Sequence, residues 1–144
     1  MAKTKHQFGK YAVIRPITYH FEKEPDWYWI FKPPTTRDEL DLQKFMFQKR
    51  THRTASGVEE LPATFMEVVM RQLALTFDGT NIPKYEEIDG ELQETGKPIL
   101  DKDASTEEVE AVLGEMPTDL TQELWKALGE HVPNWGAETN NPKA

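Results

Sequence analysis

The fold is decided by the stretch Leu61-Pro-Ala-Thr-Phe-Met-Glu-Val-Val-Met-Arg-Gln-Leu-Ala-Leu-Thr-Phe77. Its apolar residues recur at intervals of three and four, which is the spacing of side chains on one face of an α-helix. Further apolar residues widen this face until mainly Glu67, Arg71 and Gln72 are left for solvent. The pattern predicts a helix that is exposed to solvent on one side at most.

Both ends of this helix are predicted from residues with strong positional preferences. Pro62 suits a first helical turn, where its missing N–H costs nothing, and Asp78-Gly79 supplies the stop. The predicted helix, residues 61–77, contains charged residues and is shorter than the roughly 20 apolar residues of a membrane span. We therefore expect a core helix, or one that awaits a protein partner, and no membrane segment.

Two strands are predicted before this helix. The first runs from Phe8 to Ile17 and is an edge strand or ends at Pro16, because proline cannot donate to a ladder. The second runs from Trp27 to Lys32 and alternates in character. Its inward face is expected to carry three aromatic residues: Trp27, Trp29 and Phe31. Together the two strands predict a hairpin.

A second helix is predicted over about residues 36–50. Thr36 and Glu39 have the spacing of a capping box, in which each side chain accepts from the other residue's backbone N–H. Residues 51–57 are polar and are predicted to form a loop. The acidic stretch that follows residue 77 and continues to residue 94 is also predicted to be a long loop.

Two shorter helices are predicted near the carboxyl end. Ser105 and Glu108 form another capping box, and Gly114 ends that helix, so it covers about residues 105–114. Thr118 is the predicted cap of a last helix over about residues 118–129. The segment Val132-Pro-Asn-Trp135 should pack back onto the fold.

These elements predict an α+β protein with an amino-terminal antiparallel β-hairpin or small sheet followed by a mainly helical bundle. The length of 144 residues suits one domain, which we place at residues 1–135. Residues 136–144 are predicted to be a flexible tail.

The composition excludes several kinds of site. The absence of cysteine excludes disulfides, thiolate metal sites and cysteine nucleophiles. No apolar run follows the basic first residues, so we expect a cytoplasmic protein. The net charge is +5 over residues 1–53 and −13 over residues 54–144, which accounts for the total of −8. A chain polarised in this way can pair its own halves, stack head to tail or present each end to a different partner.

Catalytic signals are scarce. The four histidines lie far apart in the sequence, and the chain contains no G-x-S-x-G elbow, Walker loop or dinucleotide-binding motif. The acidic residues 86–94 lie in the most polar stretch, where carboxyl pKa values are not driven apart by burial. A basic cluster at residues 49–53 could contact phosphates, but the acidic remainder repels a polyanion. We expect no catalysis, cofactor, metal or nucleic-acid partner.

Methionine and phenylalanine are abundant on the segments with helical periodicity. These residues form adaptable apolar surfaces for helices of another chain, and they also fill ordinary cores. We predict that the partner-binding residues are Phe45, Met46, Phe65, Met66, Val69, Met70, Leu73 and Phe77.

The order of these segments resembles that of the tail assembly chaperones of long-tailed bacteriophages. The resemblance extends from about residue 11 to 130 and is carried by the Pro34-Thr35 step, the Asp78-Gly79 turn, Gly96-Lys97-Pro98, and Pro117 with Leu120 and Leu124. None of these matching residues is catalytic. The paired tryptophans and the segment at 132–135 fit the family pattern less well and leave open a different small phage protein.

The resemblance implies a non-enzymatic protein of the infected host cytoplasm. It would bind the tape-measure protein, keep it soluble and assist assembly of the tail tube, and it could form homo-oligomers. The alternative is a structural virion protein, such as a connector, neck or baseplate component, that assembles by joining its basic half to a neighbour's acidic half. An enzyme of unfamiliar type is the third possibility.

Overall fold

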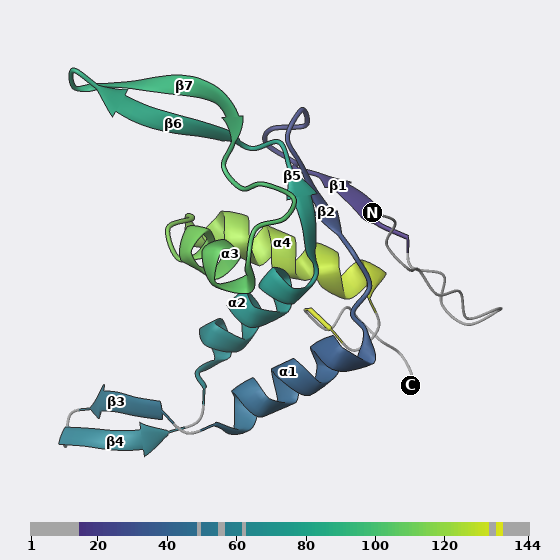
Figure 1. Cartoon of the computed structure of the whole chain (residues 1–144), viewed down its shortest axis with the longest axis vertical. Helices are drawn as coiled ribbons and strands as arrows, with labels where there is room; N and C mark the ends of the chain where they lie inside the picture. Colours follow the sequence, from purple (N-terminus) through teal and green to yellow (C-terminus); the bar gives the residue numbers. More distant parts are fainter. Residues whose placement is uncertain (1–14, 49, 55–56, 62, 133–134, 137–144) are drawn as a thin grey trace, which may run out of the picture.

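The computed structural model describes residues 15–48, 50–54, 57–61, 63–132 and 135–136. It is an α+β fold, as predicted: an antiparallel sheet contains the amino-terminal strands, and helices follow (Figure 1). The elements are β1 (Ile17–His20), β2 (Tyr28–Phe31), α1 (Thr36–Phe47), β3 (Arg50–Thr54), β4 (Gly57–Leu61), α2 (Phe65–Leu75), β5 (Phe77–Thr80), β6 (Pro83–Ile88), β7 (Glu91–Pro98), α3 (Thr106–Leu113) and α4 (Thr118–His131).

The central sheet has the order β1-β2-β5, with both pairs antiparallel. The predicted aromatic strand is confirmed as β2, and two of its three aromatic residues, Trp29 and Phe31, are fully buried. Trp27 packs against the core and is half-buried. The first predicted strand, Phe8 to Ile17, overlaps β1 only at Ile17: Arg15 and Pro16 are in no strand, β1 continues to His20, and residues 8–14 lie outside the described residues.

The carboxyl end of α2 differs from the prediction. The helix ends at Leu75, and Thr76 caps it while its hydroxyl donates to the carbonyl of Gln72 at 2.8 Å. Asp78-Gly79 was predicted to be a stop outside any element, but both residues lie in β5, which pairs with β2. The local sequence predicted that the helix ends here. It did not predict that the following residues pair with β2, which is distant in the chain.

The amino end of α2 also differs. The helix was predicted from residue 61, but Leu61 pairs with Arg50 in a hairpin and the helix starts at Phe65. Thr64 is the cap: its hydroxyl accepts from the N–H of Glu67 at 3.3 Å, and the Glu67 carboxylate accepts from the N–H of Thr64 at 2.8 Å. A complete capping box at this position fixes the start of the helix.

The capping box of α1 lies one residue earlier than predicted. Thr35 is the cap and exchanges hydrogen bonds with Asp38, so the predicted pair of Thr36 and Glu39 is wrong. Glu39 instead accepts from the indole N–H of Trp135 at 2.7 Å. Two adjacent threonines followed by two adjacent acids leave the register undecided in the sequence, and the long-range contact with Trp135 uses one of the acids elsewhere.

Two stretches predicted to be loops are hairpins. Residues 51–57 belong largely to the hairpin of β3 and β4, and the acidic stretch up to residue 94 belongs to the hairpin of β6 and β7. Asp89 and Gly90 have φ values of 54° and 82°, which is the backbone geometry of a two-residue hairpin turn. The hairpin of β3 and β4 projects from the ends of α1 and α2, and the hairpin of β6 and β7 projects from the end of the central sheet (Figure 1).

The carboxyl-terminal helices agree with most of the prediction. Ser105 and Glu108 form the capping box of α3, and Gly114 ends that helix. The predicted cap at Thr118 is wrong, since Pro117 holds that position and makes no side-chain cap. Val132 and Trp135 are buried, which confirms that this segment packs back onto the fold.

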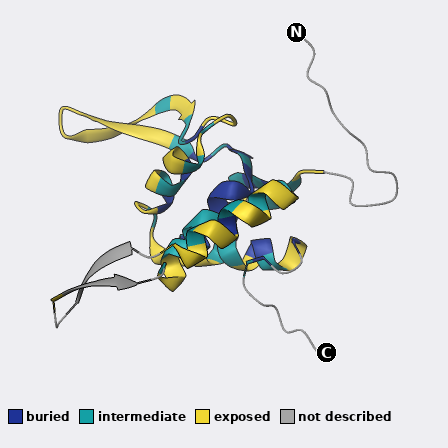
Figure 2. Cartoon of the chain, turned by 60° about the horizontal axis from the view of Figure 1, so that its bottom comes forward, coloured by how far each residue is buried: buried dark blue, intermediate teal, exposed yellow. Residues whose placement is uncertain are grey.

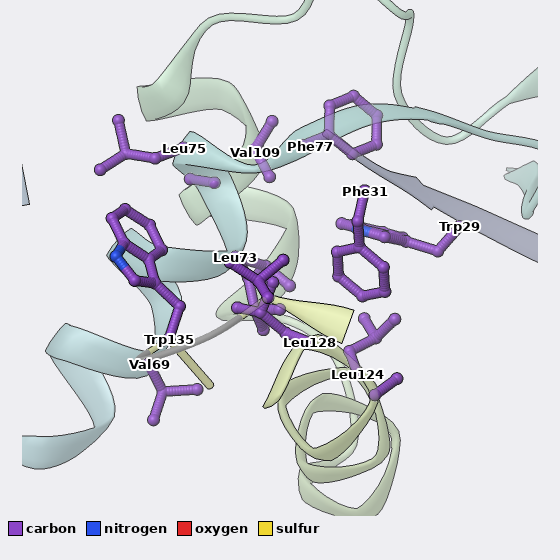
Figure 3. Packing of buried hydrophobic residues seen from close by; sticks show 14 of the residues in the cluster. Trp29, Phe31, Val69, Leu73, Leu75, Phe77, Val109, Leu124, Leu128 and Trp135 are labelled. Atoms are coloured by element: carbon purple, nitrogen blue, oxygen red, sulfur yellow. The ribbon is translucent and has the colours of Figure 1, made fainter. Parts of the chain in front are cut away.

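The core lies between the sheet, α2 and α4 (Figure 3). Complete burial of a large apolar side chain stabilises a fold by roughly 1.5–3 kcal/mol, so a few such residues determine whether this chain folds. The largest fully buried apolar side chains are Trp29, Phe31, Leu73, Leu124, Leu128, Val69 and Val109. The carboxyl part of α2 lies at the centre of this core, whereas β6 and β7 are exposed along nearly their whole length (Figure 2).

Candidate protein-binding surface

Exposed apolar side chains gather on neighbouring ends of α1 and α2. Both ends lie at the base of the hairpin of β3 and β4 (Figure 1). Phe47 ends α1 with 80% of its surface exposed, and Phe65 begins α2 with 64% exposed. Met46 and Met66 are also exposed. We call Met46, Phe47, Phe65 and Met66 the α1–α2 apolar group.

The outer face of α1 carries one further exposed apolar side chain, Leu40. Leu40 and Phe47 are seven residues apart, so they lie on the same side of the helix two turns from each other. Both are exposed, while Leu42 on the opposite side is buried in the core. One side of α1 therefore exposes two apolar side chains, Leu40 and Phe47, with the exposed polar residues Gln43 and Lys44 between them.

The Phe65 ring is held against Trp125 of α4. The two ring centroids are 5.0 Å apart and the ring planes are nearly perpendicular, which is a favourable edge-to-face geometry. The Trp125 indole N–H donates to the side-chain oxygen of Gln72 at 2.9 Å, and the Gly136 N–H donates to the same atom. Gln72 thus orients the ring on which Phe65 rests. The prediction that Gln72 faces solvent is wrong, because Gln72 is buried.

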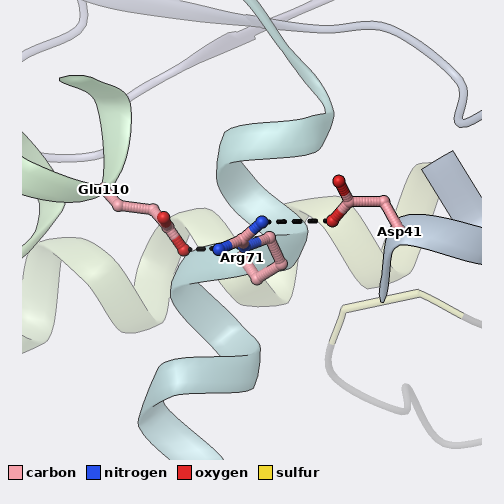
Figure 4. A network of polar contacts seen from close by, with 3 residues as sticks. All are labelled: Asp41, Arg71 and Glu110. Carbon is pink, nitrogen blue, oxygen red and sulfur yellow. Dashed lines mark hydrogen bonds and ion pairs between the residues drawn. The ribbon is translucent and has the colours of Figure 1, made fainter. Parts of the chain in front are cut away.

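Arg71 connects the three helices behind this surface (Figure 4). It donates to Asp41 of α1 at 3.1 Å and to Glu110 of α3 at 3.0 Å, and its guanidinium lies 4.2 Å from the Phe45 ring centre. Burial raises the pKa of the Glu110 carboxyl, although Arg71 acts in the opposite direction. The prediction that Arg71 faces solvent is therefore wrong, and α1 is held in place partly by its charge.

The structure divides the eight predicted partner-binding residues. Met46, Phe65 and Met66 are exposed, and Phe45 and Met70 are half-buried. The other three cannot meet a partner in this fold, because they lie in the core: Val69, Leu73 and Phe77. Phe47 was missing from the prediction, although its seven-residue spacing from Leu40 was a usable signal.

Comparison of the chain with protein-family models, curated proteins and solved structures gave no match. The surface must therefore be interpreted from its own geometry.

A second exposed apolar region lies on the hairpin of β6 and β7. Tyr85, Ile88 and Leu92 are exposed there, with Leu92 at 72%. The same two strands also carry the acidic residues Glu86, Glu87, Glu91 and Glu94. This hairpin is therefore apolar and acidic at once, unlike the α1–α2 apolar group.

The ionisable residues offer a weaker site. A cavity of about 420 Å³ beside β5 and the start of α3 is lined by charges of both signs, including Lys32, Asp78 and Lys102. Its lining contains no histidine, serine or cysteine to act as a nucleophile or a neutral-pH base. Within the described residues, no three histidine, aspartate or glutamate side chains are placed to hold a metal ion. In the same part of the chain, no helix has the length and apolar character to cross a bilayer.

Proposed function

We propose that this protein is a non-enzymatic tail assembly chaperone of a long-tailed bacteriophage, which binds the tape-measure protein and assists assembly of the tail tube around it. The observation that supports this proposal is the α1–α2 apolar group, which leaves two phenylalanines and two methionines exposed on neighbouring helix ends. Apolar surface of this kind is costly to leave in water and is typical of protein-binding sites.

The binding mechanism follows from the side chains. An amphipathic helix of the client presents apolar residues at intervals of three and four, and such a stripe fits against flexible methionines and flat phenylalanine rings. The Phe65 ring is already positioned by Trp125, so little freedom is lost there on binding. The net charge of −8 keeps the complex soluble in the host cytoplasm.

Co-expression with the tape-measure protein of the same phage tests the proposal. The variant Phe47→Ser/Phe65→Ser removes both exposed rings, and Ile88→Ser/Leu92→Ser is the matched control, because it removes exposed apolar area on the hairpin of β6 and β7. We expect the first variant to lose capture of the client by at least about tenfold, equivalent to about 1.4 kcal/mol. The control should capture the client like the wild type. Equal capture by all three proteins would refute the proposal.

The alternative is a structural virion component, and the polarised charge of the chain favours it. The composition of purified virions separates the two functions. A chaperone leaves before the particle is complete, so we expect this protein to be absent from virions. Its presence at a fixed copy number would establish the alternative in place of the chaperone.

A further inference from the structure

The residues Trp135 and Gly136, which follow α4, contact three helices. Trp135 is buried in the core (Figure 3), and its indole N–H donates to the Glu39 carboxylate of α1 at 2.7 Å. The Gly136 N–H donates to the side-chain oxygen of Gln72 in α2 at 2.9 Å. Gly136 also lies against the backbone of α4, next to Gly129. We call residues 135–136 the carboxyl-terminal latch.

Gly136 fits at this position because it has no side chain. Its φ is 74°, in the left-handed region that favours glycine. A Cβ atom here would overlap the backbone nitrogen of Gly129 and would lie 2.7 Å from the carbonyl oxygen of Trp125. Both are backbone atoms of a helix, which cannot turn aside as the end of a flexible side chain can. A larger residue at position 136 must therefore move the latch away from α4.

The side-chain oxygen of Gln72 joins the latch to the candidate binding surface. It accepts from two N–H groups, the backbone of Gly136 and the indole of Trp125, each at 2.9 Å. A carbonyl oxygen has two lone pairs, so these two donors use its full accepting capacity. The orientation of the amide follows as well, because its NH2 group could accept from neither donor. Gln72 is buried, so the loss of either bond leaves a polar group without a ready partner.

Trp125 extends this contact to the exposed surface. Its ring supports Phe65 of the α1–α2 apolar group in an edge-to-face contact, with ring centroids 5.0 Å apart. The latch, Gln72, Trp125 and Phe65 therefore form one continuous series of contacts. Movement of Gly136 frees the Gln72 amide to rotate, and the Trp125 indole then loses its fixed acceptor.

We propose that the carboxyl-terminal latch controls client binding, with Gln72 as the residue that positions the binding surface. With the latch in place, the rings of Trp125 and Phe65 are fixed, so binding costs little conformational freedom. With the latch released, both rings become mobile and binding must also order them. The part of this inference that concerns the client rests on the proposed function, whereas the coupling of Gly136 to Trp125 does not.

Two substitutions in the full chain release the latch by different means. Gly136→Ala introduces the Cβ atom that overlaps α4, and Gln72→Met removes the shared oxygen while keeping a side chain of similar length. The matched control is Gly96→Ala, because Gly96 has a similar φ of 81° and an added Cβ there would meet no described atom within 4 Å. This control has the same backbone strain without the displacement.

NMR order parameters of the indole N–H groups measure the release. The Trp125 indole should be rigid in the wild type and in Gly96→Ala, with an order parameter of about 0.85, and should fall below about 0.6 in both latch variants. Trp29 is the internal reference, because it is fully buried in the core and should stay rigid in every protein. Lower stability alone leaves both indoles rigid in the folded molecules, so a fall at Trp125 alone shows a loss of positioning.

Capture of the co-expressed tape-measure protein tests the effect on the client. We expect each latch variant to capture at least about fivefold less than the wild type, the lower end of a typical coupling between two sites, and Gly96→Ala to capture like the wild type. Two results would overturn the inference: a Trp125 indole that stays rigid in both latch variants, or one that loosens without loss of capture. A wild type that captures no tape-measure protein would refute the chaperone proposal, and the order parameters would still decide whether the latch positions Trp125.

Discussion

The two ends of α2 have nearly the same apolar composition and different surroundings. At the carboxyl end, Leu73 is fully buried and Leu75 nearly so, enclosed by the sheet and the carboxyl-terminal helices. At the amino end, Phe65 and Met66 are exposed. The difference teaches that an apolar helical stripe can serve a core along one part and a partner along another.

The same substitution at a buried and an exposed apolar residue should separate core from surface. Leu73→Asp places an unpaired carboxylate in the core, where the cost exceeds about 5 kcal/mol and is comparable to the stability of a whole domain. We expect this variant to be unfolded by circular dichroism. Phe47→Asp, at a residue that is 80% exposed, should unfold in urea like the wild type. A folded Leu73→Asp variant would contradict the buried position of this residue.

Arg71 lies between the two ends of α2 and should give the next largest effect. Arg71→Met removes both ion pairs and leaves the half-buried Glu110 without its cation, at a cost of roughly 1–3 kcal/mol. The matched control is Lys23→Met, because the Lys23–Asp119 pair is 3.5 Å long with side chains 85% and 72% exposed. We expect this control to change the urea midpoint hardly at all.

The pH dependence of the Arg71 variant follows from the raised pKa of Glu110. A carboxyl with a raised pKa in the folded state binds more protons there than in the unfolded state, so stability falls as pH rises from the ordinary value of 4.5 to the folded pKa. Loss of the Arg71 charge raises this pKa further, and the fall should become larger. An unchanged pH profile would show that Arg71 does not act on Glu110.

The caps of α1 and α2 should give effects of about 1 kcal/mol. Thr64→Ala and Thr35→Ala each remove a hydroxyl that accepts from a backbone N–H, at that typical cost. Thr36→Ala is the control, because this residue is the first helical residue and caps nothing. If Thr36→Ala proves as destabilising as Thr35→Ala, the capping box inferred from the sequence alone would be restored.

The smallest expected effect is on the acid stability of the cap at the start of α3. Hydrogen bonds from the backbone N–H and the hydroxyl of Ser105 lower the pKa of the Glu108 carboxyl. A lowered pKa contributes stability above the ordinary value of 4.5 that is lost as pH falls through the folded pKa. Glu108→Gln should lose this acid sensitivity, measured by thermal melts between about pH 5 and pH 2, while the neighbouring control Glu107→Gln should keep it.

Much of the architecture was predictable from short-range signals. The alternation in β2 and the capping box at Ser105 each depend on residues a few positions apart. The acidic hairpin was also predictable in principle, because Asp89-Gly90 is a favoured two-residue hairpin turn. Its acidic character pointed instead to a loop, and this was the main error in the secondary structure.

The candidate surface was less predictable. Helical spacing grouped Phe65 and Met66 with Val69 and Leu73, and it gave no sign that one pair faces solvent and the other the core. The exposure of Phe47 depends on where α1 ends and on how the ion pair of Arg71 with Asp41 places that helix.

The sequence by itself determined the α+β class, most of the helices, the aromatic strand and the scarcity of reactive groups, because each depends on residue type and on neighbours within a turn or a strand. Only the tertiary structure decided which apolar residues of α2 are covered, and that residues 77–80 join β2 as a third strand. Burial and edge pairing depend on segments that are distant in the chain, and no local pattern specifies which of them come together.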